Sequence, residues 1–428
     1  MRHQAVKVRL YPTTEQQEIL AQHFGCSRWW WNHALNLCIE TYQLTGKGLS
    51  QSALNAFLPK LKKQQETEWL SECYSQVLQA TTLNLVTAYR NFFEGRARYP
   101  RFKAKRNRQS IQYPQSVKVV DPSTTLRVNT ERSRGVDDCL KFPGRVGTLK
   151  AKIHRPIEGT IRTVTVSMTP SGKYFASVLM ELEGNNPPTN TLASRSDGKV
   201  AGIDLGLKDF AIVNDGCKTS KYANPKHLAK HERNLKRKQR KLDRKEKGSK
   251  SRDKARKLVA RVHERVSNVR QDYLHKLSRK LVDENQLIVV ESLNTKGMVR
   301  NHKLAASISD VGWGMFVNFL SYKLEKEGKV LVEIDRWFPS SKLCSSCHYQ
   351  VNEMPLEVRT WTCPNCGTHH DRDGNASANI RAEGIRILSV SGTGTAADGG
   401  DVRPKLGRKS KLTQSPMKSE AQAYFVEA

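Results

Sequence analysis

Residues 199–206 read Lys-Val-Ala-Gly-Ile-Asp-Leu-Gly, and residues 287–291 read Leu-Ile-Val-Val-Glu, so each apolar run delivers a carboxylate near its end. Continuous short runs of this kind, rich in β-branched residues, are typical of strands that are buried on both faces of a sheet. Further strands are expected over 210–213 and 330–334, and a helix over 309–327. Strands that alternate with helices predict an α/β domain whose central sheet is covered on both sides.

The chain before this sheet contains two other kinds of sequence. Residues 5–11 alternate between polar and apolar like a half-buried strand. From residue 15 to about residue 95 apolar residues recur at helical spacing, with breaks near 46–50 and 68–71. Residues 110–184 hold short β-rich runs separated by Gly and Pro. The pattern predicts a small barrel or twisted sheet whose first strand comes from the N-terminus, with the helical block inserted into it.

Three further segments complete the predicted organisation. Residues 183–190 are polar and rich in Gly and Pro, which predicts a linker and a domain boundary near 190. Residues 226–283 are strongly basic with periodic Leu and Val, which predicts a helical hairpin broken at Gly248-Ser249. From residue 389 the chain is Gly, Thr, Ser, Lys and Arg without periodicity, so residues 389–428 are expected to form a disordered tail.

The charge of the chain indicates its class of partner. The 428 residues include 72 Lys and Arg against 41 Asp and Glu, a formal net charge of +31. Nucleic acid is the commonest polyanion in a cell that such a field attracts. A membrane surface is the weaker alternative, because basic residues recur from Arg2 to Lys418. No signal peptide or membrane span is expected, and the nine cysteines do not resemble a disulfide framework, so we expect a cytoplasmic, nucleoid-associated protein.

Two Cys-x-x-Cys pairs form the most specific motif of the chain. Fifteen residues separate the pairs, whose members are Cys344, Cys347, Cys363 and Cys366. Four thiolates at this spacing can surround Zn²⁺ tetrahedrally, whereas a thioredoxin-like redox site would explain one pair alone. Four thiolates also close the coordination sphere, so the ion is expected to be structural. His348, His369 and His370 lie nearby as alternative ligands.

A second set of residues consists of acids at the ends of predicted strands. Asp204 and Glu291 each end a buried strand, and the segment 370–376 (His-Asp-Arg-Asp-Gly-Asn-Ala) offers a third acid. Taken singly, each acid could be a turn residue, a helix cap or a solvated side chain. Together, at the carboxyl edge of one sheet, they would repel one another unless cations bound there. Carboxylates suit Mg²⁺ or Mn²⁺, and a two-metal site can hydrolyse phosphodiesters.

Two basic segments are candidates for nucleic-acid contact. Residues 96–106 interleave cations with two aromatic residues that can stack on bases, and residues 236–241 carry charges of one sign. A solvated linker and a solvated helix face are the alternatives. The candidate residues are Arg98, Tyr99, Arg101, Phe102, Lys103, Lys105, Arg106, Lys236, Arg237, Lys238, Arg240 and Lys241. The cluster Trp29-Trp30-Trp31 is expected in a helix core rather than in a stacking platform.

These motifs together resemble the transposon-encoded TnpB proteins, in order from about residue 6 to 382. The segments that carry the resemblance are 9–13 (Arg-Leu-Tyr-Pro-Thr), 28–32 (Arg-Trp-Trp-Trp-Asn), 99–103 (Tyr-Pro-Arg-Phe-Lys), 202–206 (Gly-Ile-Asp-Leu-Gly), 290–293 (Val-Glu-Ser-Leu), 338–342 (Phe-Pro-Ser-Ser-Lys) with the cysteine pairs, and 371–376 (Asp-Arg-Asp-Gly-Asn-Ala).

The resemblance implies an RNA-guided DNA endonuclease related to the ancestors of type V CRISPR effectors, with a multidomain α+β and α/β fold. The implied parts are a wedge β-barrel (1–12 and 110–188), an inserted helical recognition domain (13–109), a RuvC-like nuclease domain of RNase H fold (196–342 and 371–388) and a zinc-ribbon insertion (343–370). The implied partners are a guide RNA from the transposon end and double-stranded target DNA beside a short motif, with one protein monomer per RNA.

Carried over by position, Asp204, Glu291 and Asp373 would form the Mg²⁺-binding triad. Asp373 is preferred to Asp371 because Asp373-Gly374-Asn375-Ala376 has the family's Asp-x-Asn-Ala spacing. Near the zinc insertion, the further candidates for nucleic-acid contact are Ser341, Lys342 and Arg359. One departure is that His348 follows the first cysteine pair where Gly is common, which predicts a different turn at that knuckle.

Two other functions compete with the nuclease. A non-catalytic regulator of transposition would bind RNA or DNA without Mg²⁺-dependent cleavage. A DNA transposase would use the same carboxylates on transposon ends without RNA.

Overall fold

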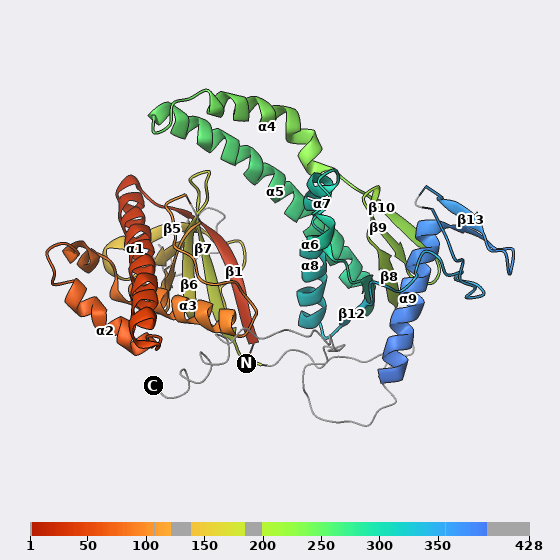
Figure 1. Ribbon diagram of the computed structural model, residues 1–428, viewed down its shortest axis with the longest axis horizontal. Coiled ribbons are helices and arrows are strands. Elements are labelled where there is room, and N and C mark those ends of the chain that lie inside the picture. Colours follow the sequence, from red (N-terminus) through yellow and green to blue (C-terminus); the bar gives the residue numbers. More distant parts are fainter. Residues whose placement is uncertain (1, 107, 121–137, 185–198, 356, 392–428) are drawn as a thin grey trace, which may run out of the picture. The chain divides into compact units, whose positions relative to one another are not determined.

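The computed structural model describes residues 2–106, 108–120, 138–184, 199–355 and 357–391 (Figure 1). The chain divides into two compact units, and the division falls between Gly184 and Asn185. The predicted boundary near 190 lies outside the described residues. The predicted start of the tail at 389 is wrong, because residues 389–391 are the last turn of helix α9 (Arg372–Ser391), and the tail from residue 392 onward lies outside the described residues.

The first unit contains a seven-stranded sheet in the order β2-β6-β7-β1-β5-β4-β3. Its strands are β1 (Arg2–Tyr11), β2 (Gln109–Tyr113), β3 (Lys118–Val120), β4 (Cys139–Lys141), β5 (Thr148–Lys152), β6 (Thr160–Met168) and β7 (Tyr174–Leu182). All pairs are antiparallel, and β1 lies between β7 and β5, with Val6 opposite Val178 and Leu10 opposite Ala151. The N-terminal strand is therefore central to the sheet. Within the described residues β2 and β3 do not pair with each other, so, of the small barrel or twisted sheet expected, the structure shows an open half-barrel.

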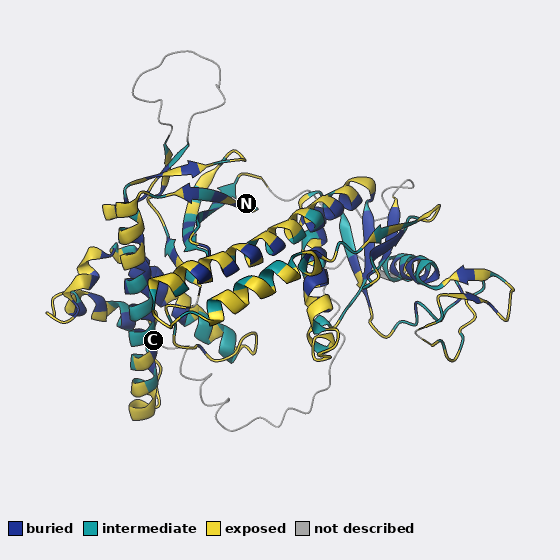
Figure 2. Cartoon of the chain, turned by 90° about the horizontal axis from the view of Figure 1, so that it is seen from above, coloured by how far each residue is buried: buried dark blue, intermediate teal, exposed yellow. Residues whose placement is uncertain are grey.

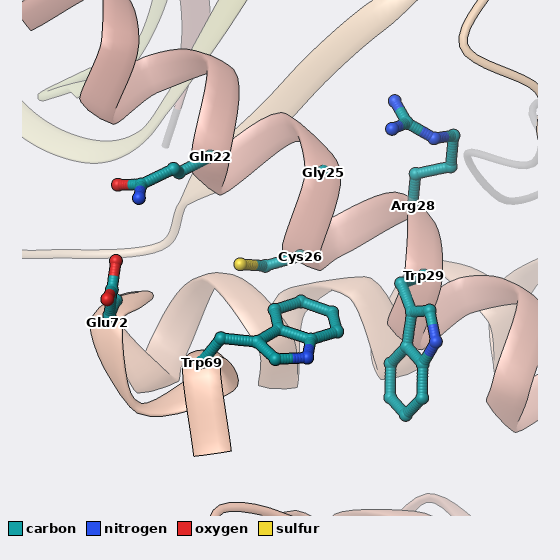
Figure 3. Close-up of a pocket in the computed structure, with 7 residues that line it drawn as sticks. All are labelled: Gln22, Gly25, Cys26, Arg28, Trp29, Trp69 and Glu72. Atoms are coloured by element: carbon teal, nitrogen blue, oxygen red, sulfur yellow. The ribbon is translucent and has the colours of Figure 1, made fainter. Parts of the chain in front are cut away.

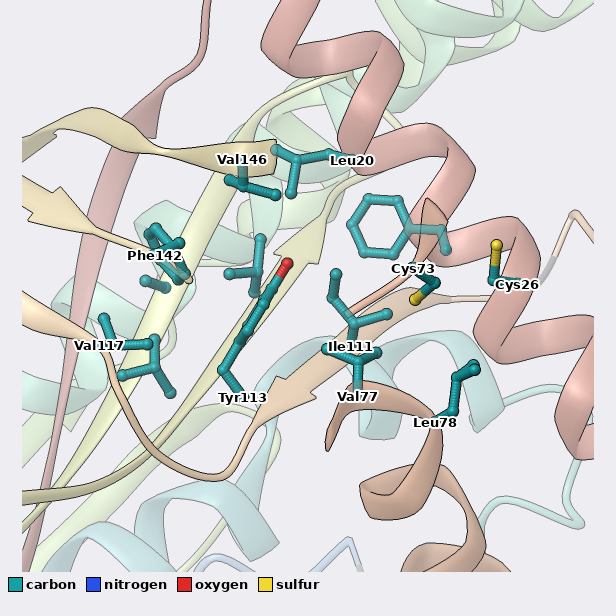
Figure 4. Packing of buried hydrophobic residues seen from close by; sticks show 14 of the residues in the cluster. Leu20, Cys26, Cys73, Val77, Leu78, Ile111, Tyr113, Val117, Phe142 and Val146 are labelled. Atoms are coloured by element: carbon teal, nitrogen blue, oxygen red, sulfur yellow. The ribbon is translucent and has the colours of Figure 1, made fainter. Parts of the chain in front are cut away.

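Helices between β1 and β2 cover this sheet. They are α1 (Thr14–Thr45), α2 (Gln51–Leu61), the 3₁₀ helix η1 (Glu68–Glu72) and α3 (Ser75–Phe93). Thr13 and Gln16 form a capping box at the start of α1, and Gly46 ends it in the left-handed conformation that glycine adopts without strain. Figure 4 shows Leu20 from α1 and Val77 from α3 packed with residues of the sheet in one core.

Part of the tryptophan cluster lies in this core, as predicted. Trp30 and Trp31 are buried, and the indole N–H of Trp30 donates to the Thr82 hydroxyl at 2.9 Å. A buried indole needs such a partner for its polar end. Trp29 is only half-buried and lies beside a pocket described below.

The second unit contains a five-stranded sheet in the order β10-β9-β8-β11-β12. The strands are β8 (Val200–Asp204), β9 (Asp209–Asn214), β10 (Thr219–Ala223), β11 (Leu287–Glu291) and β12 (Val330–Ile334). Strands β8, β11 and β12 are parallel, whereas β9 and β10 are antiparallel to their neighbours. Sequence analysis did not predict β10, because this edge strand is mostly polar and carries no apolar run.

Helices cover both faces of this sheet, as predicted (Figure 1). Ile288 and Val290 of β11 pack with helices α5 (Lys250–Glu284) and α8 (Trp313–Lys326), whereas Leu287 and Val289 pack with Ile380 of α9 (Arg372–Ser391). Figure 2 shows the central strands in the colour of buried residues. The alternation explains why β11 is a continuous apolar run.

Helix α9 approaches the sheet so closely that glycine is required both on strand β8 and on the helix itself. A Cβ atom on Gly202 of β8 would lie 2.3 Å from the Ser377 carbonyl oxygen, and one on Gly384 would lie 2.3 Å from a Val289 methyl. Both distances are below any normal contact. The backbone of α9 therefore lies directly against the strands, which places its N-terminal turn near their ends.

The basic hairpin consists of α4 (His227–Asp243) and α5, and Ser249 caps α5 at the predicted break. The single helix predicted over 309–327 is wrong. The structure has α7 (Ala305–Val311) and α8, separated by Gly312 with φ of 75°, because a left-handed residue cannot continue an α-helix. A further short helix, α6 (Thr295–Met298), follows β11.

The cysteine-containing segment follows β12 and includes the antiparallel pair β13 (Thr360–Thr362) and β14 (His369–Asp371). Strand β14 leads directly into α9. Among the helices of the described residues, none is both long and apolar enough to cross a membrane.

Candidate functional site

The four cysteines form a compact thiolate cluster. Their Sγ atoms all lie within 4.8 Å of one another, with Cys344 and Cys366 at 3.7 Å and Cys347 and Cys363 at 3.6 Å. Tetrahedral Zn–S bonds of about 2.3 Å place the sulfur atoms about 3.8 Å apart. The donor set and its spacing therefore fit a structural Zn²⁺ ion.

Both cysteine pairs adopt the same turn, so the prediction of a different knuckle at His348 is wrong. The His348 N–H donates to the Cys344 carbonyl at 2.9 Å, and the Gly367 N–H donates to the Cys363 carbonyl at 2.9 Å. The φ angles of His348 and Gly367 are 59° and 72°. A non-glycine residue reaches this left-handed region at a cost of about 1–2 kcal/mol, and histidine does so more often than most residues.

His370 supports the cluster from outside the ligand set. Its Nε2 lies 3.0 Å from the Cys344 sulfur, and burial lowers the pKa of the imidazole. We assign the proton of the neutral ring to Nε2, because the Cys344 sulfur would accept a hydrogen bond as a thiolate. His348 is exposed and His369 contacts the Thr362 hydroxyl at 3.1 Å. None of the three histidines is needed as a ligand.

The three predicted acids come from three adjacent elements of the second unit. Asp204 ends β8 and Glu291 ends β11, and these strands are parallel neighbours in which Ile203 pairs with Val290. The two acids therefore leave the sheet at the same edge. Asp373 lies in the first turn of α9, which packs on β8.

The carboxylates share one electrostatic environment. Burial, and then the charges of Asp373 and Glu291, raise the pKa of Asp204 to about 7, against the opposing effects of Arg372 and the Leu205 N–H. Burial also raises the pKa of Glu291. A buried acid whose pKa is raised by neighbouring negative charge is stabilised in its ionised form when a cation binds beside it.

The acids are not as tightly gathered as the cysteines. In the described part of the chain, the four thiolates are the one group of three or more His, Cys, Asp or Glu side chains whose ligand atoms all come within 4.8 Å. Asp373 lies 3.8 Å from the Arg359 guanidinium. A wider spacing is expected of like charges without a cation between them.

Asp371 occupies a different position from Asp373. The Asp371 carboxylate accepts from the Gly374 N–H at 2.8 Å and from the Lys221 ammonium at 2.9 Å, and these contacts lower its pKa despite burial. Asp371 thus caps the start of α9 and ties it to β10. This arrangement favours Asp373 as the third carboxylate.

Two buried asparagines join the thiolate cluster to the helix that carries Asp373. Asn375 accepts from the Ser345 N–H at 2.9 Å and donates to the Leu343 carbonyl at 2.6 Å. Asn379, one turn later, donates to the carbonyls of Ser340 at 2.8 Å and Leu343 at 2.6 Å. This link was not predicted from the sequence. The available signal was the i, i+4 spacing of the two asparagines on one helix face.

The basic segment 96–106 is docked on α1 through its backbone. The Trp31 indole donates to the Arg101 carbonyl at 3.0 Å, and Asn32 bonds both the N–H and the carbonyl of Lys103. Of the predicted contact residues here, those exposed to solvent are Arg98, Tyr99, Arg101, Phe102, Lys105 and Arg106.

Lys103 differs from its neighbours. Its ammonium lies 3.5 Å from the centroid of the Trp31 ring, and burial lowers its pKa to about 8. The structure therefore places this cation against an aromatic face of the core rather than free in solvent.

The other predicted contact residues lie in two places. On α4, Lys238 is half-buried, whereas Lys236, Arg237, Arg240 and Lys241 are exposed, and Lys236 pairs with Glu232 at 2.7 Å. Beside the cysteines, Ser341 is half-buried and the Lys342 ammonium donates to the Asn352 carbonyl at 2.9 Å. Lys342 therefore braces the cysteine-containing segment.

A pocket of about 380 Å³ lies between α1 and η1 in the first unit (Figure 3). Trp29 and Trp69 meet edge to face across it, with ring centroids 5.4 Å apart. Arg28 and Glu72 add one charge of each sign to its lining. Sequence analysis missed Trp69 and placed Trp29 in the core, because helical periodicity does not distinguish a core face from the wall of a pocket.

Comparisons with known families match most of the chain. Residues 177–302 match a family described as a probable transposase, residues 313–380 match a Cas12f1-like TNB domain, and residues 1–47 match a helix-turn-helix domain. In the structure, residues 1–47 contain β1 and the single long helix α1.

Individual relatives match over nearly the full length. The chain is 38% identical to a "Putative RNA-guided DNA endonuclease" of Streptomyces pristinaespiralis over 421 residues, 98% of this chain and 96% of the relative. It is 29% identical to "Putative RNA-guided DNA endonuclease InsQ" of Escherichia coli K12, over 91% of this chain and 94% of the relative. Among solved structures, the Cas12f1 chain of a Cas12f1–sgRNA–target DNA complex matches with a TM-score of 0.56 at 12% identity, over 89% of this chain and 98% of that chain. This last match shows a shared fold.

Proposed function

The chain belongs to the TnpB family of IS605-type transposons, and we propose that it is an RNA-guided DNA endonuclease that hydrolyses target DNA at Asp204, Glu291 and Asp373. The observation that carries this proposal is electrostatic. Two parallel strands and one helix bring three acids to one edge of the sheet, where burial and then the charges of Asp373 and Glu291 raise the pKa of Asp204 to about 7. In a chain of net charge +31, a cation-binding acid cluster is suited to a phosphodiester substrate.

We assign the domains accordingly. The mixed sheet, with an antiparallel hairpin β9–β10 beside the parallel strands β8, β11 and β12, supports a RuvC-like RNase H fold for 196–342 and 371–388. The thiolate cluster supports a zinc-ribbon insertion over 343–370. The half-barrel supports a wedge domain built from 1–12 and 110–188, with 13–109 as the recognition domain.

The three acids would hold Mg²⁺ or Mn²⁺. When bound, two such ions activate water and stabilise the leaving oxygen in an in-line displacement. The Leu205 N–H would orient the Asp204 carboxylate, and this acid would lose its proton if a cation bound beside it, because burial and neighbouring negative charge are what raise its pKa. Arg359, beside Asp373, can neutralise a phosphate that enters the site.

The partners we propose are a guide RNA from the transposon end and double-stranded target DNA next to a short motif, in the cytoplasm at the nucleoid, with one protein monomer per RNA. The exposed cations of 96–106 and of α4 support contact with the phosphate backbone of these nucleic acids. The RNA-guided names of the two relatives are consistent with this assignment.

The test uses protein expressed with its native flanking DNA and purified with whatever RNA it retains. We expect one discrete RNA, and Mg²⁺-dependent cleavage of a plasmid that matches the end of that RNA. Asp204→Ala should abolish cleavage and keep the RNA. The matched control is Glu333→Gln, an exposed acid on β12 of the same sheet, which should cleave normally. Cleavage that persists in Asp204→Ala would refute the assigned site.

Two other outcomes would identify the competing functions. A bound nucleic acid without cleavage of any guide-matched target would indicate a regulator. Strand transfer at transposon ends in the absence of RNA would indicate a transposase.

A further inference from the structure

Trp337 is the most exposed aromatic residue of the described chain, with 78% of its surface accessible. Single exposed apolar residues are common in folded proteins, so exposure alone does not assign a role. Trp337 is distinguished by its position relative to the acids and by the way its backbone is held.

Trp337 lies in the loop at the edge of the sheet that carries the acids. Strands β11 and β12 are parallel, with Glu291 opposite Ile334, and the Ser292 N–H donates to the Ile334 carbonyl at 3.1 Å. The loop 335–338 therefore leaves the sheet at the same edge as Glu291. Trp337 lies three residues beyond the residue that pairs with this acid.

The backbone on both sides of Trp337 is anchored. The Trp337 N–H donates to the Asp335 carboxylate at 2.7 Å, and the Phe338 N–H donates to the Asp335 carbonyl at 3.1 Å. Phe338 packs with the core that includes Val332. The exposed ring thus sits on a fixed turn, which lowers the entropy lost when a ligand binds it.

A cation accompanies the ring. The Arg336 guanidinium lies 4.9 Å from the centroid of the Trp337 ring, and both side chains are exposed. An aromatic face beside a guanidinium is the combination that binds single-stranded nucleic acid, since the ring stacks on a base and the cation pairs with a phosphate.

We propose that Trp337 is a stacking platform for an unpaired base of the DNA strand that enters the carboxylate site, with Arg336 contacting the adjoining phosphate. This inference rests on the proposed function. The base must be unpaired, because both faces of a base within a duplex are already stacked. Trp337 would then fix the position of the strand relative to Asp204 and Glu291.

The first experiment measures cleavage of guide-matched DNA by the complete protein–RNA complex under single-turnover conditions. Loss of one stacked base corresponds to roughly a 5- to 150-fold change. We therefore expect Trp337→Ala to cleave about 10- to 100-fold more slowly, and Trp337→Phe to keep most of the rate. RNA retention and melting temperature should not change, because the ring is exposed.

The control is Tyr322→Ala, which removes another exposed aromatic ring of the same unit, on α8, and should cleave at the wild-type rate. Equal rates for Trp337→Ala and wild type would overturn the stacking platform while leaving the nuclease assignment intact.

The second experiment does not depend on cleavage. The Asp204→Ala protein, in complex with its RNA, is irradiated with an oligothymidylate that contains 5-iodouracil, and cross-linked peptides are identified by mass spectrometry. Cross-linking at Trp337, reduced at least tenfold by Trp337→Ala, is expected. Cross-links confined to other peptides would overturn the proposal, even if wild-type protein fails to cleave and the proposed function is lost.

Discussion

The thiolate cluster and the carboxylate site bring negatively charged ligands together in different ways. The four sulfur atoms already lie within 4.8 Å of one another, whereas the three carboxylates do not, and the pKa of Asp204 rises to about 7. Burial raises the pKa of the Cys363 thiol to about 11, so this ligand can remain protonated, and therefore close to the other sulfur atoms, until zinc binds. Carboxylates are ionised at neutral pH and must stay apart or take up protons. The first arrangement suits a permanent structural ion, and the second suits exchangeable ions and a substrate.

The largest expected effect is the loss of cleavage in a variant of the carboxylate site that keeps its zinc. Asp204→Ala should lower the cleavage rate at least about a thousandfold, the scale seen when a catalytic group is removed. Zinc content should remain unchanged, because no cysteine or knuckle residue is altered. Metal analysis and single-turnover cleavage measure both quantities on the same sample. Loss of zinc in this variant would show that the two regions are not independent.

The reverse change tests the thiolate cluster. Cys363→Ser should lose zinc and several kcal/mol of local stability, since zinc binding supplies much of the folding free energy of such segments. Cleavage should also fall, because Asn375 and Asn379 join this segment to α9. Cys217→Ser is the control, since this cysteine is exposed and outside the cluster. Unchanged zinc content in Cys363→Ser would contradict the assigned ligand set.

The asparagine link tests whether the regions are coupled. Asn375→Ala leaves the Ser345 N–H and the Leu343 carbonyl without this partner, so we expect a loss of about 1–3 kcal/mol of stability. Cleavage should fall about tenfold with zinc retained. Asn36→Ala, which removes an exposed asparagine of α1, is the control. If Asn375→Ala cleaved like wild type, the link would have no part in positioning Asp373.

A smaller effect concerns pH. The pKa of Asp204 is higher in the folded chain, about 7, than its ordinary value of 3.8, so the folded state binds more protons between these values. Without Mg²⁺, stability should therefore fall as pH rises from about 4 to 7. Asp204→Asn should remove this slope and stabilise the metal-free protein at pH 8 by about 1–3 kcal/mol.

Thermal melts in a chelator across this pH range measure the effect. Added Mg²⁺ should stabilise wild type more than Asp204→Asn. A slope that is the same in both proteins would assign the titration to another group.

The smallest effect concerns the turn at His348, directly after the first cysteine pair. His348 has φ of 59° where Gly367 has 72°, so His348→Gly should relieve strain and stabilise the zinc-bound segment by about 0.5–1 kcal/mol. Gly367→Ala should destabilise it by a similar amount. Resistance of bound zinc to a chelator measures both changes. A faster loss of zinc from His348→Gly would mean that the imidazole itself holds the knuckle together.

Local pattern predicted the elements that carry the site. The runs at 199–206 and 287–291 became β8 and β11, and the two cysteine pairs became one cluster. The helix predicted over 309–327 failed at Gly312, because composition alone does not reveal that a glycine has positive φ. Edge strand β10 was missed, because a polar strand depends on its neighbour for its conformation.

The sequence by itself determined which chemical groups are present and where strands deliver them, because strand periodicity and cysteine spacing are local properties. Only the tertiary structure decided that Asp371 caps α9 while the charge of Asp373 raises the pKa of Asp204. It also decided that the Lys103 ammonium lies over the Trp31 ring. The tertiary structure likewise left Trp337 exposed at the edge of the sheet where the acids lie. These outcomes depend on packing between residues far apart in the chain, and neighbouring residues carry no signal of such contacts.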